Sequence, residues 1–173
     1  MKENDCFLKG EGVWFRYRAC GLIIEEGCVL FAGNDKDDYY YSVGGAVRVG
    51  ETAQEAARRE VLEETGVSYE PERLVFVHEN LFEGTGTLAG YPICHEVALY
   101  FLMKPRGTRT LRPHGTTNGG ERETMHWLPA ERLREYRAFP AFLADYLPEL
   151  PQGVTHIVTR NEQTGTRKRA HQK

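Results

Sequence analysis

Runs of β-branched, aromatic and aliphatic residues alternate along the chain with short stretches rich in glycine or charge. Such runs favour β-strands, because branched and aromatic side chains suit the pleated surface of a sheet. The sequence predicts strands at residues 14–24, 28–32, 39–43, 74–82, 93–103 and 154–158. The first two flank Glu25, Glu26 and Gly27, a turn signal that predicts a hairpin.

A helical period replaces this pattern between residues 53 and 65, where alanines and Val61 recur at helical spacing. Thr52 and Glu55 form a T-x-x-E capping box, which predicts the start of the helix, and Gly66 predicts its end. Further helical signals follow at residues 129–134 and 139–146. Strands interrupted by helices predict an α/β fold of packed layers with a mixed sheet.

Composition narrows the class of protein. The 173 residues, 40% of them hydrophobic, suit one domain over residues 1–173, in which residues 161–173 are expected to form a flexible basic tail. The net charge of −3 argues against nucleic-acid binding through a broad basic surface. The four cysteines include no C-x-x-C pair, and no apolar run suggests a membrane span or a signal segment. We therefore expect a cytoplasmic protein without nucleic-acid or membrane partners.

The candidate chemistry lies in the predicted helix and the glycine-rich stretch before it. The helix carries three carboxylates within two turns: Glu60, Glu63 and Glu64. On a helical wheel they share the side of the alanines, which should face inward. Carboxylates that repel one another there require a cation, and Mg²⁺ or Mn²⁺ prefers oxygen ligands and leaves room for phosphate. The alternative is a solvated acidic face, against which the alanines on the same arc argue.

The spacing of these residues resembles the Nudix box. The pattern runs from Gly45 through five residues to Glu51, then seven residues to Arg59-Glu60-Val61, one residue to Glu63-Glu64, and one residue to Gly66-Val67. This resemblance, over residues 45–67, implies an α/β/α sandwich with a mixed β-sheet and a hydrolase acting on phosphoric anhydride bonds. Val43 departs from the proline that many members carry before the paired glycines, and residues 107–120 form a long Gly/Thr-rich stretch.

The resemblance also implies a metal site. Glu60, Glu64, Glu63 and the backbone carbonyl of Gly45 are the expected ligands of Mg²⁺ or Mn²⁺. Glu63 would complete or bridge the coordination. The general base in this family is a box glutamate or an acid in a distant loop, and Glu64 is our first choice because it lies in the middle of the inward arc.

Two further residues of the box are expected to support the carboxylates. Arg59 should hold them through charge-assisted hydrogen bonds, and Glu51 should help to fix loop and helix. The alternative for Arg59 is an exposed pair with Glu55, four positions earlier, which would contribute little.

Substrate-binding residues are expected outside the box. Glu96 interrupts an apolar strand, where it could reach the metal, a substrate hydroxyl or solvent. Arg109 and Arg112 lie in a basic, glycine-containing stretch, residues 104–123, that could close over a polyphosphate or form a surface excursion. Tyr41 could stack on a nucleobase or belong to the core.

Together these expectations describe a metal-dependent pyrophosphohydrolase that cleaves a nucleoside diphosphate linked to another moiety, of the ADP-ribose or nucleotide-sugar type. A pyrophosphatase for oxidised nucleoside triphosphates and a non-catalytic nucleotide-binding module are the alternatives. Glu121 and Glu123 are candidates for a distant acid. The expected partner is a nucleotide-derived small molecule, and a homodimer is left open.

Overall fold

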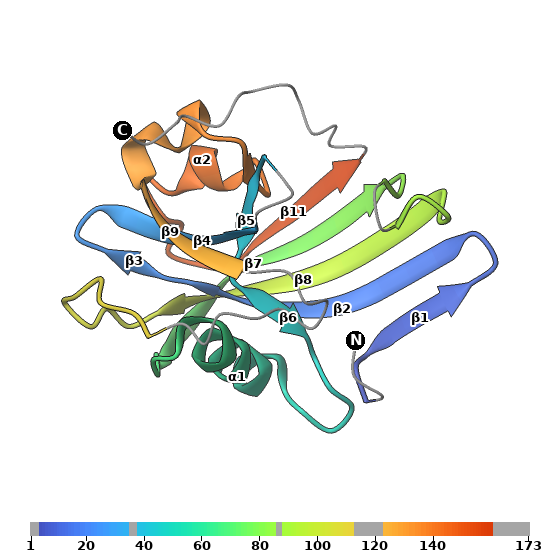
Figure 1. Ribbon diagram of the computed structural model, residues 1–173, viewed down its shortest axis with the longest axis horizontal. Helices are drawn as coiled ribbons and strands as arrows, with labels where there is room; N and C mark the ends of the chain where they lie inside the picture. The colour runs from blue at the N-terminus through green and yellow to red at the C-terminus, as the bar shows by residue number, and fades with distance from the viewer. Residues whose placement is uncertain (1–3, 35–37, 86–87, 113–122, 161–173) are drawn as a thin grey trace.

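The computed structural model describes residues 4–34, 38–85, 88–112 and 123–160, which form two β-sheets, one long helix and short helical segments (Figure 1). The strands of the larger sheet are β1 (Phe7–Gly10), β2 (Val13–Leu22), β6 (Gly44–Ala46), β7 (Pro71–Phe82), β8 (Ile93–Met103) and β11 (Thr155–Arg160). Their order is β1-β2-β8-β7-β11, and β6 also pairs with β2. Because β2 and β8 are parallel while β7 and β8 are antiparallel, the expected mixed sheet is confirmed.

The second sheet is smaller and lies beside one face of the first. Its strands are β3 (Ile24–Glu25), β4 (Cys28–Asn34), β5 (Tyr40–Ser42), β9 (Glu123–Pro129) and β10 (Ala138–Phe139). The predicted hairpin joins β3 to β4, with positive φ angles of 49° at Glu26 and 74° at Gly27. A 3₁₀ helix, η2 (Ala130–Glu135), and a short helix, α2 (Leu143–Tyr146), follow this sheet.

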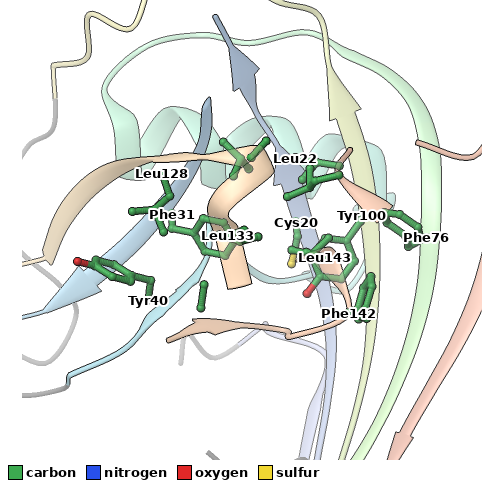
Figure 2. Close-up of a cluster of buried hydrophobic side chains, with 14 of the residues drawn as sticks. Cys20, Leu22, Phe31, Tyr40, Phe76, Tyr100, Leu128, Leu133, Phe142 and Leu143 are labelled. Atoms are coloured by element: carbon green, nitrogen blue, oxygen red, sulfur yellow. The ribbon is translucent and has the colours of Figure 1, made fainter. Parts of the chain in front are cut away.

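Alternation along β2 divides the core into two layers. Ala19 packs on one face of the sheet with α1 (Ala53–Thr65), whose alanines and Val61 are buried. Cys20 and Leu22 bury their side chains with the second sheet, η2 and α2, as Figure 2 shows. The two layers lie on opposite sides of the larger sheet (Figure 1). The helix that carries the box glutamates therefore packs against one face of the larger sheet, where it contacts β2.

The helix α1 has the boundaries that its sequence predicts. Thr52 adopts an extended conformation and caps the helix, and both hydrogen bonds of the box with Glu55 are present. Gly66 ends the helix in the left-handed region and donates its N–H to the carbonyl of Leu62. Within the described ranges, no helix has the length and apolar character needed to cross a membrane.

Four strands were not predicted as such: β6, β9, β1 and β10. Residues 44–46, expected to be loop, form β6 because their backbone pairs with Arg18, Ala19 and Cys20 of β2. Residues 123–129 form β9, and residues 7–10 form the edge strand β1. The helical signals at 129–134 and 139–146 correspond to η2 and, in part, to α2, while Phe139 lies in β10. The expected basic tail, residues 161–173, lies outside the described residues.

Candidate active site

Arg59 binds two carboxylates at once: that of Glu51, which precedes α1, and that of Glu60, the next residue of the helix. Its Nε and Nη2 atoms lie 2.7 Å and 2.8 Å from the two carboxylate oxygens of Glu51. Its Nη1 atom donates to Glu60, and Nη2 also donates to the carbonyl of Ala46 at 3.1 Å. The hydrogen bond from Arg59 lowers the pKa of Glu51. The alternative pairing of Arg59 with Glu55 is not seen, because Glu55 is engaged by the cap.

Strand β6 brings the backbone of the paired glycines against the helix carboxylates. A Cβ atom on Gly45 would lie 2.5 Å from the carboxyl carbon of Glu60, so only glycine allows this approach. Gly44 has a φ of 138° and donates its N–H to Oε1 of Glu64 at 3.1 Å. The glycine strand and the two inward glutamates, Glu60 and Glu64, thus form one unit.

Glu64 is partly buried, and its Oε2 atom is buried without a hydrogen-bond partner among the described residues. Burial raises the pKa of Glu64 well above its ordinary value, and the negative charge of Glu123 adds to this effect. The positive charge of Arg18 acts in the opposite direction. A buried carboxylate oxygen without a partner favours a cation next to it.

The donor set at this place fits a hard divalent cation. Glu60 and Glu64 offer carboxylate oxygens, and the backbone of Gly45, whose carbonyl is the third expected donor, lies against Glu60. Among the described residues no three His, Cys, Asp or Glu side chains form a closed metal cage. Two carboxylates and a carbonyl suit Mg²⁺, which keeps several waters and binds substrate phosphates through the remaining positions.

The inward placement expected for Glu63 is wrong. Its side chain is 44% exposed and lies 3.4 Å from Arg48 and 3.6 Å from Arg59. Adjacent helical residues point about 100° apart, so Glu63 falls at the edge of the arc while Glu64 falls in its centre. Glu63 therefore lies at the surface next to Arg48 and Arg59, beside the site formed by Glu60 and Glu64.

Tyr41 lies at the site, where its hydroxyl forms a hydrogen bond with an acidic side chain. Its hydroxyl donates to Oε1 of Glu123 at 2.8 Å, and its ring contacts Tyr39 edge to face. Glu123, at the start of β9, acts on the pKa of Glu64 and therefore lies near it. A second acidic group thus approaches Glu64 from outside α1. The other candidate for a distant acid, Glu121, lies outside the described residues.

Glu96 is buried and paired, so it is not a solvent-face residue. Its Oε2 atom accepts hydrogen bonds from Nε of Arg16, at 2.7 Å, and from Nη2 of the same residue. Its Oε1 atom lies 3.9 Å from Nη1 of Arg18. Arg18 in turn donates to the carbonyl of Gly44 at 2.9 Å, so it stands between Glu96 and the glycine strand.

Glu96 belongs to a row of polar residues that crosses four strands. Register places Arg16 opposite Glu96, Glu96 opposite Asn80, and Asn80 opposite Thr159. We call these four residues the polar row. Thr159 donates to Asn80 at 2.8 Å, and the row continues the face that carries Arg18. It offers a carboxylate, a guanidinium, an amide and a hydroxyl side by side.

The two arginines of β2 were missed in the sequence. Arg16 and Arg18 stand two positions apart inside an otherwise apolar and aromatic run, so they share one face of the strand. Two cations on one face of a largely buried strand require acidic partners. That requirement was the available signal, but the sequence does not show which acid lies opposite.

The structure does not bring Arg109 or Arg112 to the carboxylates. Arg109 pairs with Glu26, through its Nε atom at 3.1 Å and by donation from Nη2 to the Glu26 carbonyl at 2.7 Å. Arg112 donates its backbone N–H to the carbonyl of Thr65 at 2.9 Å. The buried carboxylate of Glu25 accepts the backbone N–H groups of residues 106 and 107 and holds this stretch against the β3–β4 hairpin. The side chain of Arg109 is thus engaged by Glu26, whereas the contact of Arg112 is made by its backbone.

Comparison with known proteins agrees with this geometry. A family model described as the NUDIX domain matches residues 14–150. Similar solved structures include the MutT mutator protein of Bacillus halodurans, with 15% identity, a TM-score of 0.61, and coverage of 82% of this chain and 89% of that chain.

A MutT protein of Methanosarcina mazei has 19% identity, a TM-score of 0.57, and coverage of 78% and 91%. A NUDIX-family hydrolase of Clostridium perfringens has 17% identity, a TM-score of 0.53, and coverage of 77% and 96%. No curated protein matches the sequence. The match of the NUDIX model over most of the chain, together with the box glutamates gathered at a glycine strand, shows that the chain belongs to the Nudix hydrolase family.

Proposed function

We propose that this Nudix hydrolase is a metal-dependent pyrophosphohydrolase that cleaves a nucleoside diphosphate linked to another moiety, of the ADP-ribose or nucleotide-sugar type. The observation that carries the proposal is the unit formed by Glu60, Glu64 and the Gly44–Gly45 backbone. Arg59 fixes Glu60 in this unit, and one buried oxygen of Glu64 has no hydrogen-bond partner within the part of the chain that the structure describes.

The residues have separate tasks in this proposal. Glu60, Glu64 and the carbonyl of Gly45 hold Mg²⁺ or Mn²⁺. The ion supplies charge neutralisation at the diphosphate and activation of water. Glu123, held by Tyr41 and close to Glu64, accepts the proton of the attacking water. Arg59 and Glu51 keep the first turn of α1 and strand β6 together.

The polar row supports the substrate class. A carboxylate and an amide, as in Glu96 and Asn80, match the alternating donors and acceptors of a sugar. Arg18 links this row to the glycine strand through Glu96 and Gly44, so a ligand spanning both places would carry a diphosphate at one end and hydroxyl groups at the other.

The test is a product analysis with Mg²⁺ or Mn²⁺ and a panel of ADP-ribose, nucleotide sugars and oxidised nucleoside triphosphates. We expect release of a nucleoside monophosphate from a nucleoside diphosphate derivative, and loss of turnover when EDTA removes the metal. Release of pyrophosphate from a triphosphate would instead identify the nucleotide-sanitising activity. Thermal stabilisation by nucleotides without any product would identify a binding module.

A test variant and a control variant show whether the activity depends on the proposed site. Glu64→Gln should lower kcat at least about 1,000-fold, because it removes a charged ligand of the metal. Glu70→Gln is the matched control, since the side chain of Glu70 is exposed and pairs with Arg58 at the surface. Equal rates for Glu64→Gln and wild type would reject the assignment.

A further inference from the structure

Arg18 is a largely buried cation, with a side chain 11% exposed, and it contacts two parts of the molecule at once. Its Nη2 atom donates to the carbonyl oxygens of Ser42, at 2.6 Å, and Gly44, at 2.9 Å. Its Nη1 atom lies 3.9 Å from Glu96 of the polar row. The box residues do not include Arg18, and the proposed chemistry gives it no task of its own.

The two carbonyls that Arg18 binds flank Val43, where β5 ends and β6 begins. The carbonyl of Val43 itself accepts the N–H of Gly21 at 3.1 Å. The N–H of Gly44 donates to Glu64, while the carbonyl of Gly44 accepts from Arg18. Both peptide groups on either side of Gly44 therefore have fixed partners, and Arg18 fixes the one that leads into Gly45.

The backbone at Gly44 packs closely against β2. A Cβ atom on Gly44 would lie 2.3 Å from the carbonyl oxygen of Ala19, which shows how closely the strand is pressed onto β2. The carbonyl of Gly44 and the N–H of Gly45 belong to one planar peptide group, so a donor that holds the first also orients the second. A guanidinium with two carbonyl acceptors sets that orientation more firmly than an ammonium, which has no planar fork.

We propose that Arg18 is a positioning residue that orients the Gly44–Gly45 backbone and Glu64 for metal binding and couples them to the polar row through Glu96. The inference deepens the proposed function and rests on it, because it takes Glu60, Glu64 and Gly45 as the metal ligands. Arg18 acts through the backbone and touches neither the metal nor the substrate.

The test is a titration with Mn²⁺ in the absence of substrate, in which electron paramagnetic resonance measures the free ion. Arg18→Lys keeps the charge and loses the fork, so we expect an apparent Kd for Mn²⁺ about 10-fold higher and a kcat lower by a similar factor. The matched control is Arg16→Lys, whose parent side chain binds Glu96 but neither carbonyl. It should leave the Kd for Mn²⁺ within about twofold of wild type.

Two results would overturn the inference: a wild-type Kd in Arg18→Lys, or an equal loss in Arg18→Lys and Arg16→Lys. Glu64→Gln in the same titration separates this failure from that of the proposed function. If Glu64→Gln also binds Mn²⁺ like wild type, the metal site itself is wrong. If it loses Mn²⁺ while Arg18→Lys does not, only the role of Arg18 is rejected.

Nuclear magnetic resonance of the wild-type protein provides the test if Arg18→Lys does not fold. Mg²⁺ should shift the side-chain Nη resonances of Arg18 together with the backbone amide of Gly44. The resonances of Arg58, which pairs with Glu70 at the surface, should not move. A response at Gly44 without any response at Arg18 would contradict the proposed coupling.

Discussion

The hydroxyl of Tyr41 lies 2.8 Å from a carboxylate oxygen of Glu123, which joins strand β5 to the start of β9. The two residues come from segments 82 positions apart, and their contact places an acidic group close to Glu64. The carboxylate of Glu123 is thereby oriented by a donor outside the box. Glu123 and Glu64 are the two candidates for the proton acceptor, and variants of each residue can distinguish them.

Glu123→Gln should lower kcat about 100-fold or more while leaving Mn²⁺ binding unchanged, because a base that touches only the water does not hold the metal. Glu64→Gln should lower both. Steady-state kinetics and Mn²⁺ titration of the two variants give the comparison. A wild-type rate in Glu123→Gln would return the role of general base to Glu64, the choice made from the sequence.

Tyr41→Phe tests the orientation of Glu123 separately. It keeps the ring and removes the donor, so kcat should fall about 3- to 10-fold, well short of the loss in Glu123→Gln. KM should change little, since the ring that contacts Tyr39 remains. A large rise in KM with an unchanged kcat would instead indicate that Tyr41 binds substrate, as the sequence suggested.

Gly45→Ala should reduce turnover about 100-fold or more, because a Cβ atom there would lie 2.5 Å from the Glu60 carboxyl carbon and displace the carboxylate. Gly90→Ala is the matched control, since nothing lies within 4 Å of its added Cβ atom. Turnover and thermal unfolding of both variants decide the point. Equal activities would show that the Gly45 backbone is not part of the site.

The pair of Glu51 with Arg59 predicts a pH-dependent contribution to stability. The hydrogen bond from Arg59 lowers the pKa of Glu51 in the folded protein, so ionised Glu51 stabilises the fold above its ordinary value of 4.5. This contribution is lost as the pH falls through the lowered pKa. Glu51→Gln should therefore unfold about 3 °C below wild type near pH 7. The two melting temperatures should converge as the pH falls below 4.5, and a difference independent of pH would contradict the pairing.

His78 gives a pH effect in a different window. Burial lowers the pKa of His78 from 6.5 to about 4. The unfolded chain binds a proton below about pH 6.5 that the folded protein takes up only near pH 4, so stability falls as the pH decreases across this interval. Between about pH 7 and pH 5, the melting temperature of wild type should drop more than that of His78→Gln. Parallel curves from circular dichroism would reject the assignment.

Local signals in the sequence were sufficient for α1 and for the longer strands. The capping box, the alanine period and Gly66 define the helix with no help from the rest of the chain, and β8 follows from an apolar run that His95 and Glu96 interrupt. The contact of Arg59 with Glu60 was also expected from the motif, whereas its pair with Glu51 was not. The metal-binding roles of these residues stay predictions.

Non-local pairing explains what could not be predicted. Residues 44–46 become a strand only because β2 accepts them, and residues 123–129 only because β4 does. The contact of Arg16 with Glu96 depends on the parallel register of β2 and β8, which local sequence does not specify. Arg109 was assigned to the substrate from charge alone, whereas the turn at Glu26 supplies its partner.

Strand β2 links these observations, since its alternate residues serve two separate tasks. Arg18 faces the polar row, and Ala19, its neighbour, faces α1. A single inserted or deleted residue between them would exchange the two faces along half of the strand, turning cations towards the helix and small apolar residues towards the row. Evolution can therefore change chain length at the turn around Gly12, but related sequences should keep the length of β2 constant.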